Sequence, residues 1–257
     1  MGCAQLSLVP PVATIEACVA ALERQDRRSN SREAANVAWA LATLEACDLP
    51  TWERLMAVVA REGATLADVA YAQLAQAHLL MQLRYGHSVP CPPQLLQRSQ
   101  AAWQALLFGR QREQQQLLQG RAVSRLEFLL AAAVAQLAGS HAVEAGHIVH
   151  SGRGEPLLQV DIALPQLRIA VEADGPVHFI RNKMGRDGQP LLNGPTGARN
   201  RLLRHHGWHV VEVPFWVCNA AMGTGAPQAA LLAHLQQHTD LAAAIAERAA
   251  AASSGTK

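Results

Sequence analysis

Three carboxylates in the second half of the chain have a spacing that could bind a metal ion. Glu172 and Asp174 are two residues apart in the stretch IAVEADG, so both project from the same side of a strand. Asp161 lies in the preceding apolar stretch, LLQVDIAL, and shares that side if the two strands pair. Carboxylates grouped in this way hold Mg²⁺, which activates water in phosphodiester cleavage. The chemistry indicated is metal-assisted hydrolysis, with Mg²⁺ as the candidate cofactor.

The same carboxylates also have a purely structural interpretation. Asp174 begins the turn sequence DGP, which is typical of a chain reversal. Asp161 and Glu172 could pair with nearby arginines instead of a metal ion. The spacing alone leaves both interpretations open.

Basic side chains follow directly after the carboxylates. Between residues 178 and 209 a single acid, Asp187, stands against a group of cations. These cations are Arg181, Lys183, Arg186, Arg199, Arg201 and Arg204. The surplus predicts a phosphate-bearing partner such as a nucleic acid. This local surplus of positive charge is not evident from the whole chain, because the net charge is only +2.

Histidines and a second basic group are weaker candidates. The histidines fall into two sets, His141, His147 and His150, and His205, His206 and His209. Neither set has cysteine partners or an HExxH pattern, so packing or surface roles are predicted. A looser basic cluster consists of Arg110, Arg112, Arg121 and Arg125, and a solvated face is the expected role.

Alternating apolar residues predict the strands that must position the carboxylates. Strands are expected over 157–164 and 167–174, with a tight turn at Pro165 and Gln166. Such a short connection makes the pair antiparallel, and Glu172 and Asp174 then face away from the core. A third strand is expected over 208–213.

Loop and helix signals surround these strands. Residues 175–195 read as a long binding loop, and 196–206 as a helix with one basic face that ends at Gly207. Upstream, Ser124 and Glu127 form a capping box that starts a helix, and Gly139 ends it.

The first half of the chain is predicted to be helical from residue 12 to residue 85. One helix ends near Asp48-Leu49-Pro50, and Thr51 is expected to cap the next, which runs to Ala60. Gly63 breaks that helix, and Thr65 or Asp68 starts another. The proline cluster at 90–93 then separates a helix over 94–119, rich in Gln and Arg.

A short sequence echo suggests repeats within this half. The stretch DVAYA at 68–72 resembles NVAWA at 36–40, with an offset of 32 residues. An echo at that period favours stacked helical-hairpin repeats. The alternative is an ordinary bundle of similar alanine-rich helices.

Composition excludes several classes of protein. Half of the 257 residues are hydrophobic, so wholesale disorder is excluded, and no apolar run is long enough for a membrane span. The five cysteines form no C-x-x-C motif, which argues against a disulfide framework and favours a reducing compartment. No secretory signal and no clear transit peptide is found at the N-terminus.

Several of these stretches together resemble the RAP domain family. They are VDIA at 160–163, IAVEADGPVHF at 169–179, LNGPT at 192–196 and GWHVVEVPFW at 207–216. The resemblance covers about residues 124–240. The helical half is similar to the repeats that precede RAP domains in octotricopeptide-repeat proteins of algal organelles and in FAST-kinase-domain proteins, through NVAWAL at 36–41.

The resemblance implies an α+β protein with three parts. A helical repeat-like region is expected over 1–121, a small RAP domain with a restriction-endonuclease-like fold over 122–240, and an alanine-rich tail over 241–257. The implied function is RNA binding in a chloroplast or mitochondrion, in the processing, stability or translation of transcripts. The implied partners are single-stranded RNA and other ribonucleoprotein components, with no membrane.

Residue roles follow from the same resemblance. The six cations named above would clamp phosphates, and Trp208, Phe215 or Trp216 would stack on bases if exposed, although Trp208 at a strand position favours core packing. The endonuclease-like group binds metal through an Asp and a following Glu-x-Lys. Here Asp161 and Glu172 match, but Asp174 replaces the lysine.

Two functional hypotheses remain, with a third on the nature of the chain. A non-catalytic RNA-binding factor is the leading hypothesis. The alternative is a metal-dependent endoribonuclease, in which His178 or Lys183 would compensate for the missing lysine. Whether the chain is an enzyme therefore stays open. The third interpretation is a fragment or degenerate relative of a longer factor.

Overall fold

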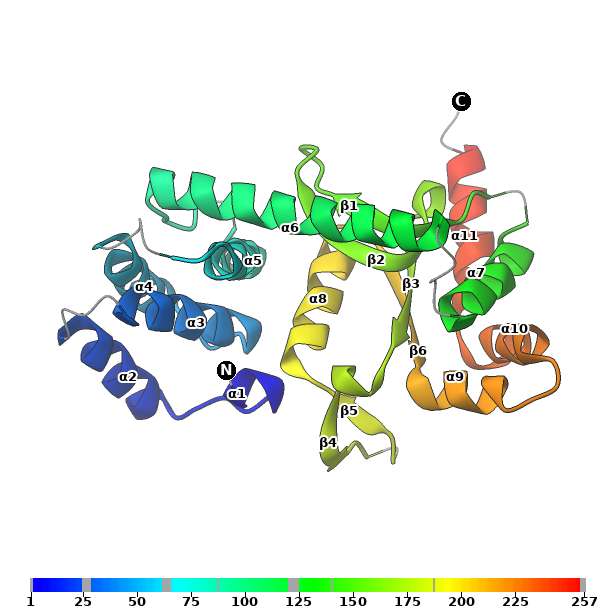
Figure 1. Ribbon diagram of the computed structural model, residues 1–257, viewed down its shortest axis with the longest axis horizontal. Coiled ribbons are helices and arrows are strands. Elements are labelled where there is room, and N and C mark those ends of the chain that lie inside the picture. The colour runs from blue at the N-terminus through cyan, green and yellow to red at the C-terminus, as the bar shows by residue number, and fades with distance from the viewer. Residues whose placement is uncertain are drawn as a thin grey trace. The chain divides into compact units, whose positions relative to one another are not determined.

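The computed structural model describes residues 2–24, 29–61, 66–86, 88–119, 125–139, 141–186 and 188–254. They form helices first and a sheet with covering helices afterwards, so the predicted α+β class is confirmed (Figure 1). The chain divides into two compact units. Unit 1 contains the residues up to Leu106 together with Phe179–Leu202, and unit 2 contains Leu107–His178 together with the residues from Leu203 onward.

Helices make up most of unit 1. They are α1 (Gly2–Gln5), α2 (Val12–Arg24), α3 (Ser29–Thr43), α4 (Leu49–Arg61), α5 (Asp68–Tyr85) and the start of α6 (Pro93–Gln119). The echoed stretches lie in α3 and α5, which pack against each other. The equivalent aromatic residues Trp39 and Tyr71 are both buried. Trp39 Nε1 donates to the Gln76 side chain of α5, and Arg98 of α6 lies over the Tyr71 ring.

The start of α4 differs from the prediction. Thr51 is not the cap, because its backbone N–H donates to Asp48 Oδ1 at 2.8 Å. Asp48 therefore caps the helix, and Pro50 lies in the first turn, where a missing N–H leaves no bond unmade. Asp68 begins α5, as predicted. The expected signals Gly63, Thr65, Arg121, Ser124 and Asp187 lie outside the described residues.

Unit 2 is built on a four-stranded sheet with the order β1-β2-β3-β6. The strands are β1 (Glu144–His150), β2 (Pro156–Leu164), β3 (Ile169–Asp174) and β6 (His209–Pro214). The predicted antiparallel pair is β2 and β3, in a register that places Ile162 beside Val171. A 3-10 turn, η1 (Pro165–Leu167), joins them, and Arg168 follows in the left-handed region at φ 50°.

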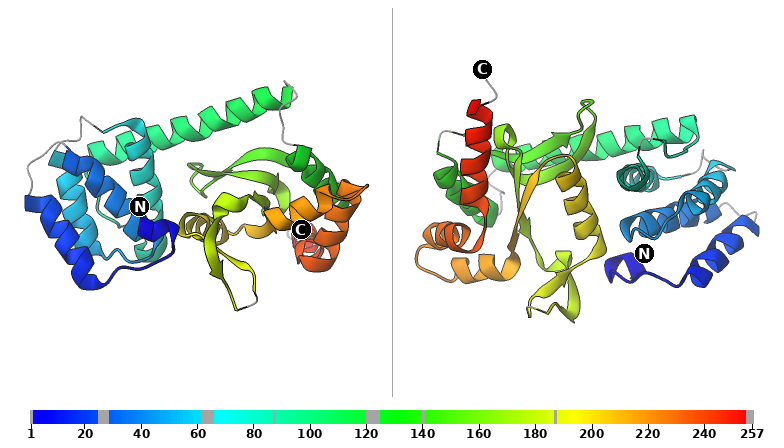
Figure 2. Two further views of the ribbon diagram at one scale, coloured as in Figure 1. Left: turned by 60° about the horizontal axis from the view of Figure 1, so that its bottom comes forward. Right: turned by 180° about the vertical axis from the view of Figure 1, so that it is seen from behind.

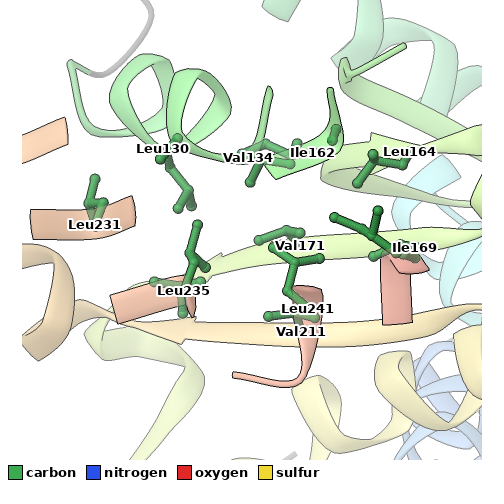
Figure 3. Packing of buried hydrophobic residues seen from close by; sticks show 14 of the residues in the cluster. Leu130, Val134, Ile162, Leu164, Ile169, Val171, Val211, Leu231, Leu235 and Leu241 are labelled. Atoms are coloured by element: carbon green, nitrogen blue, oxygen red, sulfur yellow. The ribbon is translucent and has the colours of Figure 1, made fainter. Parts of the chain in front are cut away.

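Helices cover one face of this sheet. They are α7 (Arg125–Ala138), α9 (Phe215–Met222), α10 (Pro227–His238) and α11 (Leu241–Ser254). Ile162 and Val171 point from the sheet into a core that also contains Leu130 of α7 and Leu235 of α10 (Figure 3). The expected tail at 241–257 is therefore different, because α11 buries Leu241 in the same core.

The expected binding loop at 175–195 also contains ordered elements. They are the 3-10 turn η2 (Pro176–His178) and the strands β4 (Phe179–Met184) and β5 (Pro190–Leu192), which pair antiparallel as a hairpin (Figure 2). Helix α8 (Gly194–His205) follows and leads into β6. No helix among the described residues is long and apolar enough to cross a membrane.

All five cysteines are free thiols, as their spacing indicated. Burial raises the pKa of the Cys47 thiol to about 12 and that of the Cys218 thiol to about 11. Thiols in that state are protonated at neutral pH and are poor nucleophiles. These cysteines therefore pack as small apolar side chains.

Candidate nucleic-acid interface

The predicted carboxylates lie on one face of the sheet. Because Ile162 pairs with Val171, the alternation of side chains puts Asp161, Glu172 and Asp174 on the face opposite that pair. Glu212 joins them, because β6 runs parallel to β3 and Glu212 pairs with Glu172. The alternation in VVEVP carried the signal for Glu212, which the sequence reading left unused.

The environment of these carboxylates differs from the prediction. Glu172 and Asp174 were expected to face solvent, but they are 0% and 1% exposed. The expectation was wrong because alternation predicts which residues share a face of a strand but not whether that face is covered. Strand β3 is an internal strand. It has β2 on one side and the parallel strand β6 on the other, and the face that carries Glu172 and Asp174 is covered as well as the core face.

Two of the three carboxylates, Asp161 and Asp174, have local contacts within the protein. Asp161 Oδ2 accepts the backbone N–H of Ala173 at 2.9 Å, where the β2–β3 pairing ends. Asp174 Oδ1 lies 3.4 Å from His178 Nδ1. Within the described parts of the chain, no group of three or more His, Cys, Asp or Glu residues is placed to hold a metal ion. The three carboxylates therefore do not form the metal group that their spacing suggested.

The hairpin of β4 and β5 presents cations to solvent. Arg181 and Lys183 on β4 are exposed, and so is Arg186 in the connecting turn. The turn is held by backbone bonds, in which Gly185 N–H donates to Gln189 O at 2.7 Å and Gly188 N–H donates to Gly185 O at 3.1 Å. Gly188 has a φ of 76°, a conformation that favours glycine. The bond between Gly185 and Gln189 thus joins the end of β4 to the start of β5.

The three cations of α8 have protein contacts. Arg201 donates through Nη2 to Thr43 O at 2.7 Å, and its Nε lies 3.7 Å from Glu45 Oε1. Arg204 Nη2 lies 3.1 Å from Glu212 Oε1. Arg199 Nε donates to the Asn200 side chain at 3.3 Å. The predicted cations therefore sort into a hairpin set in solvent and a helix set that also makes contacts within the protein.

Local sequence signals set the residues at which α8 begins and ends. Asn193 caps the helix, because its Oδ1 accepts the Thr196 N–H at 2.9 Å. The predicted stop at Gly207 is confirmed, with a φ of 80° and a bond from Trp208 N–H to Leu203 O at 3.0 Å. The sequence reading placed Asn193 in a binding loop and missed its capping role.

Several of the aromatic and histidine candidates make contacts within the protein. Trp208 is buried, and its ring lies 5.6 Å from that of His147, so the predicted core role is confirmed. Phe215 and Trp216 contact each other edge to face at 5.1 Å at the start of α9. His209 Nε2 lies 3.0 Å from Asp240 Oδ1. Arg110 and Arg112 of the looser basic cluster are solvent-exposed, as predicted.

Comparison with known families supports the resemblance. Residues 171–224 match the family model described as the RAP domain, which is the segment from β3 through α9. RAP domains are generally RNA-binding domains. No curated protein matches the chain. The match encloses the whole hairpin with its three exposed cations.

Proposed function

We propose that this protein is an RNA-binding factor and that the β4–β5 hairpin supplies its main phosphate contacts. The observation that carries the proposal is that Arg181, Lys183 and Arg186 are exposed within the RAP match. Arginine and lysine side chains that neutralise phosphates release counterions from RNA, and this release drives binding.

The helical region adds little electrostatic attraction of its own. Residues 1–106 contain eight arginines and nine acidic residues, so their net charge is −1. A surface with this net charge exerts no net electrostatic attraction on phosphates. This balance supports the hairpin, rather than the helices, as the part that first attracts RNA.

The proposal extends to the setting and the target. The helical half resembles repeats of organellar RNA factors, and we propose a role in the processing, stability or translation of single-stranded chloroplast or mitochondrial transcripts. A fluorescent fusion of the full chain in plant or algal cells and in animal cells should label an organelle in one of them. Diffuse signal in all of these cells would contradict the organellar part.

Salt-dependent binding of a labelled single-stranded RNA tests the hairpin. We expect the triple variant R181Q/K183Q/R186Q to bind more weakly and to reduce the slope of log K against log salt by about 2. The matched control R110Q/R112Q/R153Q removes three exposed charges elsewhere and should retain the wild-type slope. An unchanged slope in the hairpin variant would show that its cations do not contact phosphates.

The alternative, an endoribonuclease, has less support, although its carboxylates share one face of the sheet. Glu172 and Asp174 are buried, and Asp161 accepts a backbone N–H. The binding assay should also be run with Mg²⁺ and the RNA length checked on a gel. Cleavage by the wild-type protein that is lost in Glu172→Gln would overturn the non-catalytic assignment.

A further inference from the structure

The β4–β5 hairpin carries apolar side chains in solvent as well as cations. Met184 is 61% exposed and Leu191 is 37% exposed. Single exposed apolar residues are common, but these two lie on the paired strands of one short hairpin, and Met184 stands between Lys183 and Arg186 in the sequence. A surface of mixed cations and apolar groups matches a ligand that is both charged and apolar.

The pairing of β4 with β5 is irregular, unlike that of an ordinary hairpin. Phe179 pairs with Leu192 and Met184 pairs with Pro190, so four residues of β4 stand opposite Leu191 alone. Bulges of this kind bend a strand and re-aim its side chains. Ile180 is buried at 5% exposure and anchors the bulged stretch.

We propose that Met184 and Leu191 contact unpaired bases while the neighbouring cations contact phosphates. This inference rests on the proposed RNA-binding function and assigns base-contacting residues to it. Unpaired bases offer apolar faces on which side chains can stack, whereas bases inside a duplex are already stacked on each other. The polarisable thioether of Met184 also makes favourable contacts with aromatic rings.

The two kinds of contact differ in their response to salt. Phosphate contacts weaken as salt rises, because counterion release then yields less free energy. Apolar contacts with base faces release no counterions and should persist at high salt. Removing the apolar side chains should therefore lower affinity by the same factor at every salt concentration.

The experiment compares M184Q/L191Q with wild type over a series of salt concentrations, using a labelled single-stranded RNA. We expect about tenfold weaker binding with an unchanged slope of log K against log salt. The control V69Q/F128Q removes two apolar side chains that are 66% and 65% exposed elsewhere, and it should bind like wild type. Duplex RNA of the same sequence should show little difference between wild type and M184Q/L191Q.

The outcomes separate the inference from the function on which it rests. If wild type binds no RNA, the proposed function fails and the inference fails with it. If wild type binds but M184Q/L191Q matches the control, or loses duplex binding equally, only the base-contact inference is overturned. The variant M184L/L191M retains apolar surface and should restore affinity, and continued loss would show that a change of fold explains the result.

Discussion

Asp48 determines where α4 begins, and its charge state links this helix to pH. The Asp48 carboxylate accepts the Thr51 N–H, and hydrogen bonds from the Thr51 side chain and backbone hold the pKa of Asp48 below its usual range. A carboxyl with a lowered folded-state pKa stabilises the fold above its unfolded-state pKa. The contribution is lost as pH falls through the folded-state pKa.

Asp48→Ala should lower the free energy of unfolding by about 0.5–2 kcal/mol at neutral pH, because α4 loses its cap. The deficit should shrink below about pH 4, where the wild-type carboxyl is also protonated. Urea unfolding from about pH 7 down to about pH 3 measures both effects. Asp48→Asn keeps a capping oxygen and should retain most of the stability at neutral pH. A deficit for Asp48→Ala that is constant with pH would contradict this role.

Arg201 shows why some residue roles are not predictable from local sequence. Its spacing on α8 indicated a basic face for binding phosphates, but its guanidinium donates to the carbonyl of Thr43, 158 residues earlier. Thr43 ends α3, and Glu45 beyond it has a φ of 56° without the glycine that usually marks such a stop. No pattern near residue 201 or residue 45 indicates this contact, because it depends on the tertiary fold.

At the scale of elements, strand periods were predictable and strand neighbours were not. The alternation over 169–174 gave the bounds of β3 within a few residues and placed Glu172 and Asp174 on a common side. The predicted solvent exposure of that side was wrong, because exposure depends on what packs over that face of the sheet. The parallel partner β6 begins 35 residues after β3 ends, and that pairing is set by the crossover through α8.

The hairpin was missed for a different reason. Its strands are short and bulged, so β4 has no clean alternation, and glycines at 185 and 188 read as a loop. The cations within it were identified from charge alone, which needs no knowledge of secondary structure. Charge counting therefore found the candidate interface, while periodicity failed to describe its backbone.

Two glycines of α8 make a matched prediction about packing in unit 1. A Cβ at Gly194 would clash with the carbonyl oxygen of Ala4 in α1, whereas a Cβ at Gly197 would lie 3.7 Å from Arg201 Nη1, an ordinary contact. Gly194→Ala should therefore destabilise the protein by about 1–3 kcal/mol. Gly197→Ala should be stabilising by about 0.5–1 kcal/mol, because alanine favours helix.

Thermal and urea unfolding of the two variants test this difference. Equal stabilities for Gly194→Ala and Gly197→Ala would show that α1 does not pack against the start of α8. If the clash is the cause, removal of residues 1–8 should restore the stability of Gly194→Ala, because the Ala4 carbonyl oxygen is then absent.

At the scale of the whole molecule, the C-terminal helix completes unit 2. Helix α11 buries Leu241, Ala244 and Ile245 in the core. Arg248 on the same helix donates through Nη1 to Leu167 O and Gly207 O, both at 3.0 Å. These carbonyls belong to the turn before β3 and the turn before β6, so Arg248 links α11 to both turns by hydrogen bonds.

Deleting residues 241–257 should remove most of the stability of unit 2. Exposing the Leu241 and Ile245 sites costs about 3–6 kcal/mol, a large share of a typical domain's 5–15 kcal/mol. Circular dichroism and urea titration should show loss of a cooperative transition. Deleting only 251–257 keeps the buried residues of α11 and should leave the transition nearly unchanged. A wild-type transition in the longer deletion would contradict the core role of α11.

The division into units has a consequence for dissecting the protein. The chain passes between the units at 106/107, at 178/179 and again at 202/203, so the hairpin and most of α8 belong with the first helices. A protease that nicks the backbone after residue 106 leaves unit 1 composed of two polypeptides. The fragments should therefore co-elute on native gel filtration, and reconstituting unit 1 requires co-expression of both pieces rather than of the later one alone.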